Sequence, residues 1–179
     1  MKIVETIAVV AISASVSTAL AQSDTNCPLS ARHNGETITV HGSVRSEPHD
    51  MAFDVDGCND TVLATFAGYA DSGVPSSQLN NDREMKRFIK YTSSEYRSRR
   101  SHICEGCTKY GDVKAELTGI LQVATMPPGA TKNNLGFIRD SRGKYLGIYG
   151  WGHPVPFAKY RIIIESVRDA EARRLPRPK

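Results

Sequence analysis

The chain has 179 residues, a formal net charge of +4 and 40% hydrophobic residues, which suits one globular domain. Residues 173–179 hold four bases and no acid, so this end of the chain alone accounts for the net charge. The overall charge is therefore only a weak argument for nucleic acid or a membrane as the partner.

Residues 1–21 have the features of a cleaved secretory signal. An apolar stretch runs from about Ile7 to Leu20, and Ala19 and Ala21 are the small residues that a signal peptidase accepts before its cleavage site. The stretch is too short and too rich in Ser and Thr to span a bilayer well. We therefore predict a periplasmic or secreted protein with no transmembrane segment in the mature chain.

The four cysteines all follow this segment. In an oxidising compartment an even number favours disulfides, and three pairings are possible. We favour Cys27–Cys58 with Cys104–Cys107, although crossed pairings stay open. Cys27–Cys58 would close a loop of roughly 30 residues, which is worth about 3–4 kcal/mol on a chain-entropy estimate.

Three strands are predicted in the first half of the mature chain. From Glu36 to Arg45, apolar and polar residues alternate, and this period of two is typical of a half-buried strand. A turn at residues 47–50 leads to a second alternating strand that begins at Met51 and ends at Gly57. Residues 61–66 are apolar enough to form a third strand that is buried on both faces.

From Asp82 the hydrophobic period changes to that of a helix, with Asp82 as the predicted N-cap. The opposite face is rich in Arg and Lys, so we expect an amphipathic helix that is basic on its outer side. The apolar face of this helix would carry Met85, Phe88, Ile89, Thr92 and Tyr96.

Residues 112–123 form the clearest alternating segment and the predicted fourth strand. A long loop follows, from about Met126 to Ala158, and contains a predicted hairpin around the turn at residues 140–143. Residues 160–167 are β-branched and form the predicted last strand. A basic Pro/Arg tail, 169–179, ends the chain.

The order of these elements resembles the OB-fold, a five-stranded Greek-key barrel. Gly42 and Gly119 lie in the middle of long strands, where such a barrel bends sharply. The resemblance covers residues 36–168, after an N-terminal extension, 22–35. It implies a mainly β, five-stranded OB-like barrel with one amphipathic helix between strands 3 and 4. A β-sandwich with one helix is the alternative.

The long loop is the predicted binding region, because in OB-like barrels the loop between the last two strands borders the usual binding face. Its segment Gly150-Trp151-Gly152-His153 is also similar to a Gly-aromatic-Gly-His segment of exported bacterial proteins, a similarity that implies no activity. Aromatic rings here could stack on a sugar or a peptide; the alternative is that the Trp ring plugs the barrel mouth. The candidate ligand-binding residues are Tyr149, Trp151, His153, Phe157 and Arg142.

The segment Cys104-Glu105-Gly106-Cys107 supports an alternative function. Neighbouring bases would lower a thiol pKa, and a CxxC pair supplies half of a zinc site. A thiol–disulfide or zinc-dependent activity is therefore the second hypothesis. However, the sequence lacks the βαβ context of a thioredoxin and a recognisable second half of a zinc site.

No catalytic constellation or phosphate-binding loop occurs in the sequence. The segment from Asp54 to Asp60 only partly matches a calcium loop, and we interpret it as a turn after a strand. We therefore predict a non-enzymatic exported domain, without a cofactor, that binds a small ligand or an envelope protein. Nucleic acid is not favoured, because the strands lack interleaved aromatic residues. A third hypothesis is a structural role in which the basic tail meets an acidic surface.

Overall fold

The computed structural model describes residues 27–46, 51–60, 62–69, 72–93, 95–97, 103–152 and 157–176. For residues 45–46, 95–97 and 103–108 only the backbone is described. The predicted signal, residues 1–21, lies outside the described residues. In the part of the chain that is described, no helix has the length and apolar character needed to cross a membrane.

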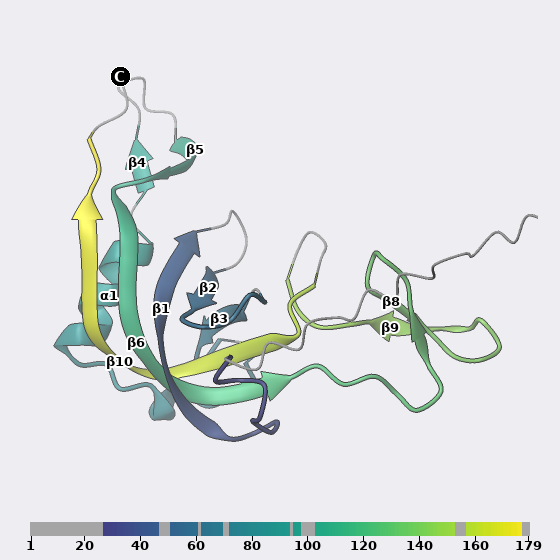
Figure 1. Ribbon diagram of the computed structural model, residues 1–179. Coiled ribbons are helices and arrows are strands. Elements are labelled where there is room, and N and C mark those ends of the chain that lie inside the picture. The colour runs from purple at the N-terminus through teal and green to yellow at the C-terminus, as the bar shows by residue number, and fades with distance from the viewer. Residues whose placement is uncertain are drawn as a thin grey trace, which may run out of the picture.

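Five strands close into a barrel in the order β1-β2-β3-β10-β6, with α1 against β10 and β6 (Figure 1). Strands β3 and β10 run parallel, and the other neighbours run antiparallel. The predicted OB-like barrel with one helix between strands 3 and 4 is confirmed. The barrel strands are β1 (Thr37–Ser46), β2 (Met51–Val55), β3 (Val62–Phe66), β6 (Tyr110–Val123) and β10 (Tyr160–Arg174).

The barrel interior is filled by the apolar residues of the alternating segments. Val40, Phe53, Leu117, Leu121 and Ile162 belong to one buried cluster to which four of the barrel strands contribute here. Each such side chain contributes about 1.5–3 kcal/mol when it is buried. The alternation in the sequence therefore translates directly into the inner face of the barrel.

Two glycines allow neighbouring strands to approach closely. A Cβ atom at Gly42 would run into the carbonyl oxygen of Asp54, and one at Gly119 would run into that of Ile163. Both obstacles are backbone atoms, so no side-chain rotation could relieve the overlap. The close approach of the neighbouring backbone therefore explains why glycine is needed at both positions.

Helix α1 (Arg83–Thr92) begins as predicted at Asp82, whose carboxylate accepts a hydrogen bond of 2.9 Å from the Met85 N–H. Met85 and Phe88 are buried in the barrel core. The expected helical face reached Tyr96, but the helix ends at Thr92. The reason is that the following backbone forms β4 (Glu95–Arg97), which pairs with β5 (Ile103–Thr108).

Strand β10 is longer than expected and continues to Arg174 rather than ending near residue 167. Its last residues pair with the first part of β6, with Glu171 opposite Lys114 and Arg174 opposite Tyr110. The sequence did not reveal this extension, because a break in register occurs between Arg168 and Glu171. Part of the expected tail is therefore a strand.

The disulfide predicted between Cys27 and Cys58 is present. Leu29, two residues after Cys27, is 1% exposed and packs into the barrel core. The N-terminal segment is thus fastened to the barrel by a covalent bond and by a buried side chain. The side chains of Cys104 and Cys107 are not among those that the structure describes, so the bridge between them stays a prediction.

The predicted hairpin is also present, as part of a second small sheet, β7-β8-β9. Asp140 organises its turn, because one carboxylate oxygen accepts hydrogen bonds of 2.9 Å from the N–H groups of Arg142 and Lys144. We call residues 126–152 and 157–158 the arm; its sheet projects away from the barrel (Figure 1). The strands of the arm are β7 (Thr131–Lys132), β8 (Phe137–Arg139) and β9 (Tyr145–Ile148).

Candidate functional site

Trp151 joins the arm to the barrel. Its N–H donates a 3.1 Å hydrogen bond to the Ala158 carbonyl, and its carbonyl accepts a 2.8 Å hydrogen bond from the Ala158 N–H. This bridge joins the two segments of the arm. The half-buried ring packs on a small cluster that includes Ala52 and Leu63 and is separate from the barrel core. Since neighbouring residues of these strands face the core, the ring lies on the outer wall of the barrel rather than in its interior.

A cation contacts the same ring from the last strand. The Arg161 guanidinium carbon lies 5.2 Å from the centroid of the Trp151 ring, which is a cation–π distance. Arg161 is 8% exposed and donates a hydrogen bond of 2.8 Å from Nε to the side-chain oxygen of Gln122. A buried charge therefore lies against the Trp ring at the base of the arm.

Two other predicted residues also have partners within the arm. The Lys132 Nζ lies 4.3 Å from the centroid of the Tyr149 ring. The Phe157 ring lies against Gly136, where a Cβ atom would overlap the ring. The Tyr149 N–H donates a 2.8 Å hydrogen bond to the Gly136 carbonyl, so these two aromatic residues lie close together.

The structure therefore gathers only part of the predicted site. Tyr149, Trp151 and Phe157 lie at the base of the arm, where they contact other residues of the chain. Arg142 lies in the turn between β8 and β9, at the other end of that hairpin. His153 lies outside the described residues. The predicted residues thus do not converge on one pocket in the part of the chain that the structure describes.

The arm exposes an apolar sheet face that the sequence analysis did not single out. Phe137 is opposite Ile148 and Arg139 is opposite Tyr145, so these four side chains share one face of the sheet. The rings of Phe137 and Tyr145 meet edge to face at 6.1 Å. Tyr145 is 51% exposed and Ile148 45%, whereas Ile138 on the opposite face is 6% exposed. We call Phe137, Arg139, Tyr145 and Ile148 the open face.

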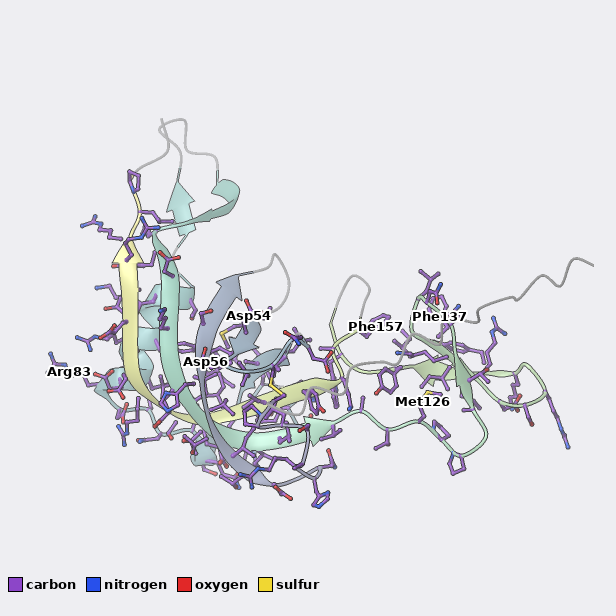
Figure 2. The ribbon with its side chains drawn as sticks, viewed as in Figure 1. Asp54, Asp56, Arg83, Met126, Phe137 and Phe157 are labelled. Atoms are coloured by element: carbon purple, nitrogen blue, oxygen red, sulfur yellow. A yellow bond between two sulfur atoms is a disulfide. The ribbon has the colours of Figure 1, made fainter. Side chains whose placement is uncertain are left out.

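Further large apolar side chains of the arm are exposed. Leu135 is 52% exposed and Leu146, at an irregularity in the β8–β9 register, is 45% exposed. Apart from Tyr69, the exposed large apolar residues in the described parts of the chain all belong to the arm. Figure 2 shows Met126 and Phe137 on the arm, away from the barrel.

The sequence carried a weak signal for this surface. In Tyr145-Leu146-Gly147-Ile148, no polar residue alternates with the apolar ones. Such a run reads equally well as a strand buried on both faces. Only the projection of the arm away from the barrel shows that the run is exposed.

The arm is also positively charged. Residues 126–152 contain Lys132, Arg139, Arg142 and Lys144 but only one acid, Asp140. The Asp140 carboxylate accepts hydrogen bonds from two backbone N–H groups of the turn.

A further cation lies next to the last barrel strand, beside the base of the arm. A hydrogen bond with the Tyr160 side chain raises the pKa of Lys159 above its ordinary value of 10.5. Like any lysine it is protonated at neutral pH, so Lys159 adds a positive charge beside the base of the arm.

Other candidate sites receive less support. The backbone of β5, which contains Cys104 and Cys107, pairs irregularly with β4; their side chains lie outside the described ones, so redox and zinc chemistry stay predictions. The segment after β2 is a turn as predicted, with Gly57 at φ 80° and a 3.0 Å hydrogen bond from the Cys58 N–H to the Val55 carbonyl. Among the described residues, no group of three or more His, Cys, Asp or Glu side chains is placed to hold a metal ion.

Comparison of the chain with protein-family models, with curated protein sequences and with solved structures gives no match.

Proposed function

We propose that this protein is a non-enzymatic binding domain, periplasmic or secreted, that contacts its ligand or envelope partner through the arm. The observation that carries the proposal is the open face, where Tyr145 and Ile148 are about half exposed on the sheet of the arm. The disulfide between Cys27 and Cys58 is compatible with an exported protein.

Exposed apolar side chains clustered on one face are typical of interaction surfaces. A covering partner would remove this area from water and gain roughly 25 cal/mol for each Å² of apolar surface buried. A partner would meet a sheet whose base is already joined to the barrel by the contacts of Trp151 with Leu63 and Arg161. Such preorganisation lowers the entropic cost of binding.

The predicted residues then have two different roles. Tyr149, Trp151 and Phe157 position the arm through their contacts with Lys132, Arg161 and Gly136. Arg142, exposed at the turn, is available for direct contact with a partner. His153 keeps its proposed place in the binding region on sequence grounds.

The double variant Tyr145→Ser/Ile148→Ser tests the proposal. Mature protein would be mixed with the total envelope fraction of the cells that produce it, and the bound share measured after sedimentation. We expect the double variant to lose most of its binding while its free energy of unfolding falls by no more than about 2 kcal/mol, the cost of losing the edge-to-face contact with Phe137 and the cross-strand packing.

The matched control is Tyr69→Ser. Tyr69 is 62% exposed but lies after β3 rather than on the arm. Its replacement should leave binding unchanged. Equal losses in the control and in the double variant would contradict a binding role for the arm.

A further inference from the structure

We propose that the arm binds the surface of an anionic phospholipid bilayer. This inference rests on the proposed function, in which the arm is the region that makes contact, and it specifies the chemistry of the partner. The open face supplies the apolar part of the contact, and the basic residues of the arm supply the electrostatic part.

The distribution of charge on the arm fits a negatively charged partner. Arg142 and Lys144 lie in the turn that leads directly into β9, the strand with the most exposed apolar residues. Arg139 is on the open face itself, opposite Tyr145. The single acid, Asp140, accepts hydrogen bonds from backbone N–H groups of the turn. Basic residues that border an exposed apolar surface are attracted to anionic lipid headgroups.

The apolar residues fit the boundary between headgroups and acyl chains. Tyr145 combines an apolar ring with a polar hydroxyl, and such side chains favour this boundary. Ile148, Leu146 and Leu135 are purely apolar and about half exposed. Long basic side chains such as Arg139 can place their carbon stems beside apolar residues and keep their charge among the headgroups.

The shape of the molecule allows this contact without moving the barrel. The sheet of the arm projects to one side, away from the barrel and α1 (Figure 1). Arg83 on α1 lies at the far side of the molecule from the arm (Figure 2). The arm could therefore reach a bilayer surface while the barrel stays in the aqueous phase.

The test measures binding of the full mature protein to lipid vesicles by co-sedimentation. Vesicles of phosphatidylethanolamine with phosphatidylglycerol would be compared with vesicles of phosphatidylcholine. We expect binding to the anionic vesicles, much weaker binding to the neutral ones, and a fall in binding as salt is added.

Two charge variants locate the contact. Each basic residue near an anionic surface strengthens binding about fivefold, so Arg142→Ser/Lys144→Ser should lower the partition coefficient about 25-fold. The matched control, Arg83→Ser/Lys86→Ser, removes the same charge from α1 and should leave partition nearly unchanged. The apolar variant Tyr145→Ser/Ile148→Ser should also weaken vesicle binding.

The outcomes separate this inference from the proposed function. If the protein does not bind anionic vesicles at low salt, the lipid inference is wrong. If envelope binding still depends on Tyr145 and Ile148 in that case, the proposed function stands and the partner is a protein or another envelope component. If vesicle binding falls equally in the α1 control, the arm is not the lipid contact and the inference fails.

Discussion

The strands of the barrel and of the arm both carry apolar side chains, but these side chains are buried in the barrel and exposed on the open face of the arm. In the barrel, the apolar residues of β1, β2, β6 and β10 face inward and bury one another. In the arm, the three strands are short and form one layer, and no other segment among the described residues covers the face that carries Tyr145 and Ile148. Within the described residues, whether an apolar strand becomes core or interaction surface is decided by what lies opposite it.

Among the variants that test this comparison, the largest loss of stability is expected for a substitution at Gly119. In Gly119→Ala the new Cβ atom would overlap the backbone of Ile163, so β6 and β10 could not pair as they do. We expect a loss of about 3 kcal/mol or more in the free energy of unfolding, measured by urea denaturation.

Gly143→Ala in the turn of the arm is the counterpart. Nothing lies within 4 Å of a Cβ there, although φ is +80°. This variant should lose only about 1–2 kcal/mol, since the cost is confined to the backbone conformation. Equal losses in the two variants would contradict the difference in available space between Gly119 and Gly143.

Next comes the disulfide. Cys27→Ser/Cys58→Ser should lower the free energy of unfolding by about 3–4 kcal/mol, because the loop that the bridge closes spans 31 residues. The measurement is denaturation of the variant beside the oxidised wild type. A variant as stable as the wild type would show that the burial of Leu29 is enough to hold the N-terminal segment.

Trp151→Ala tests the junction between the two regions. The ring is half-buried against Leu63 and Arg161, so the loss should be about 1–3 kcal/mol, less than for a fully buried aromatic residue. The arm should also be cleaved faster by a protease, because its base is no longer held. Trp151→Phe is the control and should keep most of the packing. Unchanged proteolysis would show that the arm is held by other contacts.

The smallest effect is expected at the helix cap and depends on pH. The Met85 N–H, together with Arg168, holds the pKa of Asp82 below its ordinary value of 3.8. The ionised cap therefore stabilises the fold above that pH and loses its contribution as the pH falls through the lowered pKa.

At neutral pH, Asp82→Ala should lower the Tm by about 2–4 °C. The difference from the wild type should shrink in acid, as thermal melts across the acidic range would show. Asp82→Asn keeps an oxygen acceptor for the cap and should lose less. A constant difference at all pH values would exclude a role for the charge of Asp82.

Much of the barrel could be predicted from the sequence, because its local patterns agree with its tertiary structure. The alternation around Val40 and Leu117, the cap at Asp82 and the glycine at 119 each have a local cause that the sequence shows. The ends of elements were less predictable. The helix stops before Tyr96 because the following backbone pairs with the next strand along the chain, β5. Strand β10 continues past residue 167 because its last residues pair with the start of β6, a strand distant in the sequence.

The candidate site was predictable only in part for a similar reason. The long loop and its aromatic residues stand out in the sequence, but their contacts do not. Trp151 was a candidate for ligand stacking, whereas its ring packs on the barrel wall beside Arg161. Conversely, Tyr145 and Ile148 resemble ordinary strand residues, and only the three-dimensional arrangement leaves them exposed.

The parallel pairing of β3 with β10 has a consequence for how the chain folds. Val62 pairs with Tyr160, so the ring of strands cannot close until β10, about a hundred residues after β3, has been synthesised. Pairings between such distant segments form slowly. Cys27 and Cys58, by contrast, both emerge before β3 and can be joined early. A chain cut short before Tyr160 would leave β3 and β6 as bare edges, the usual starting point of aggregation.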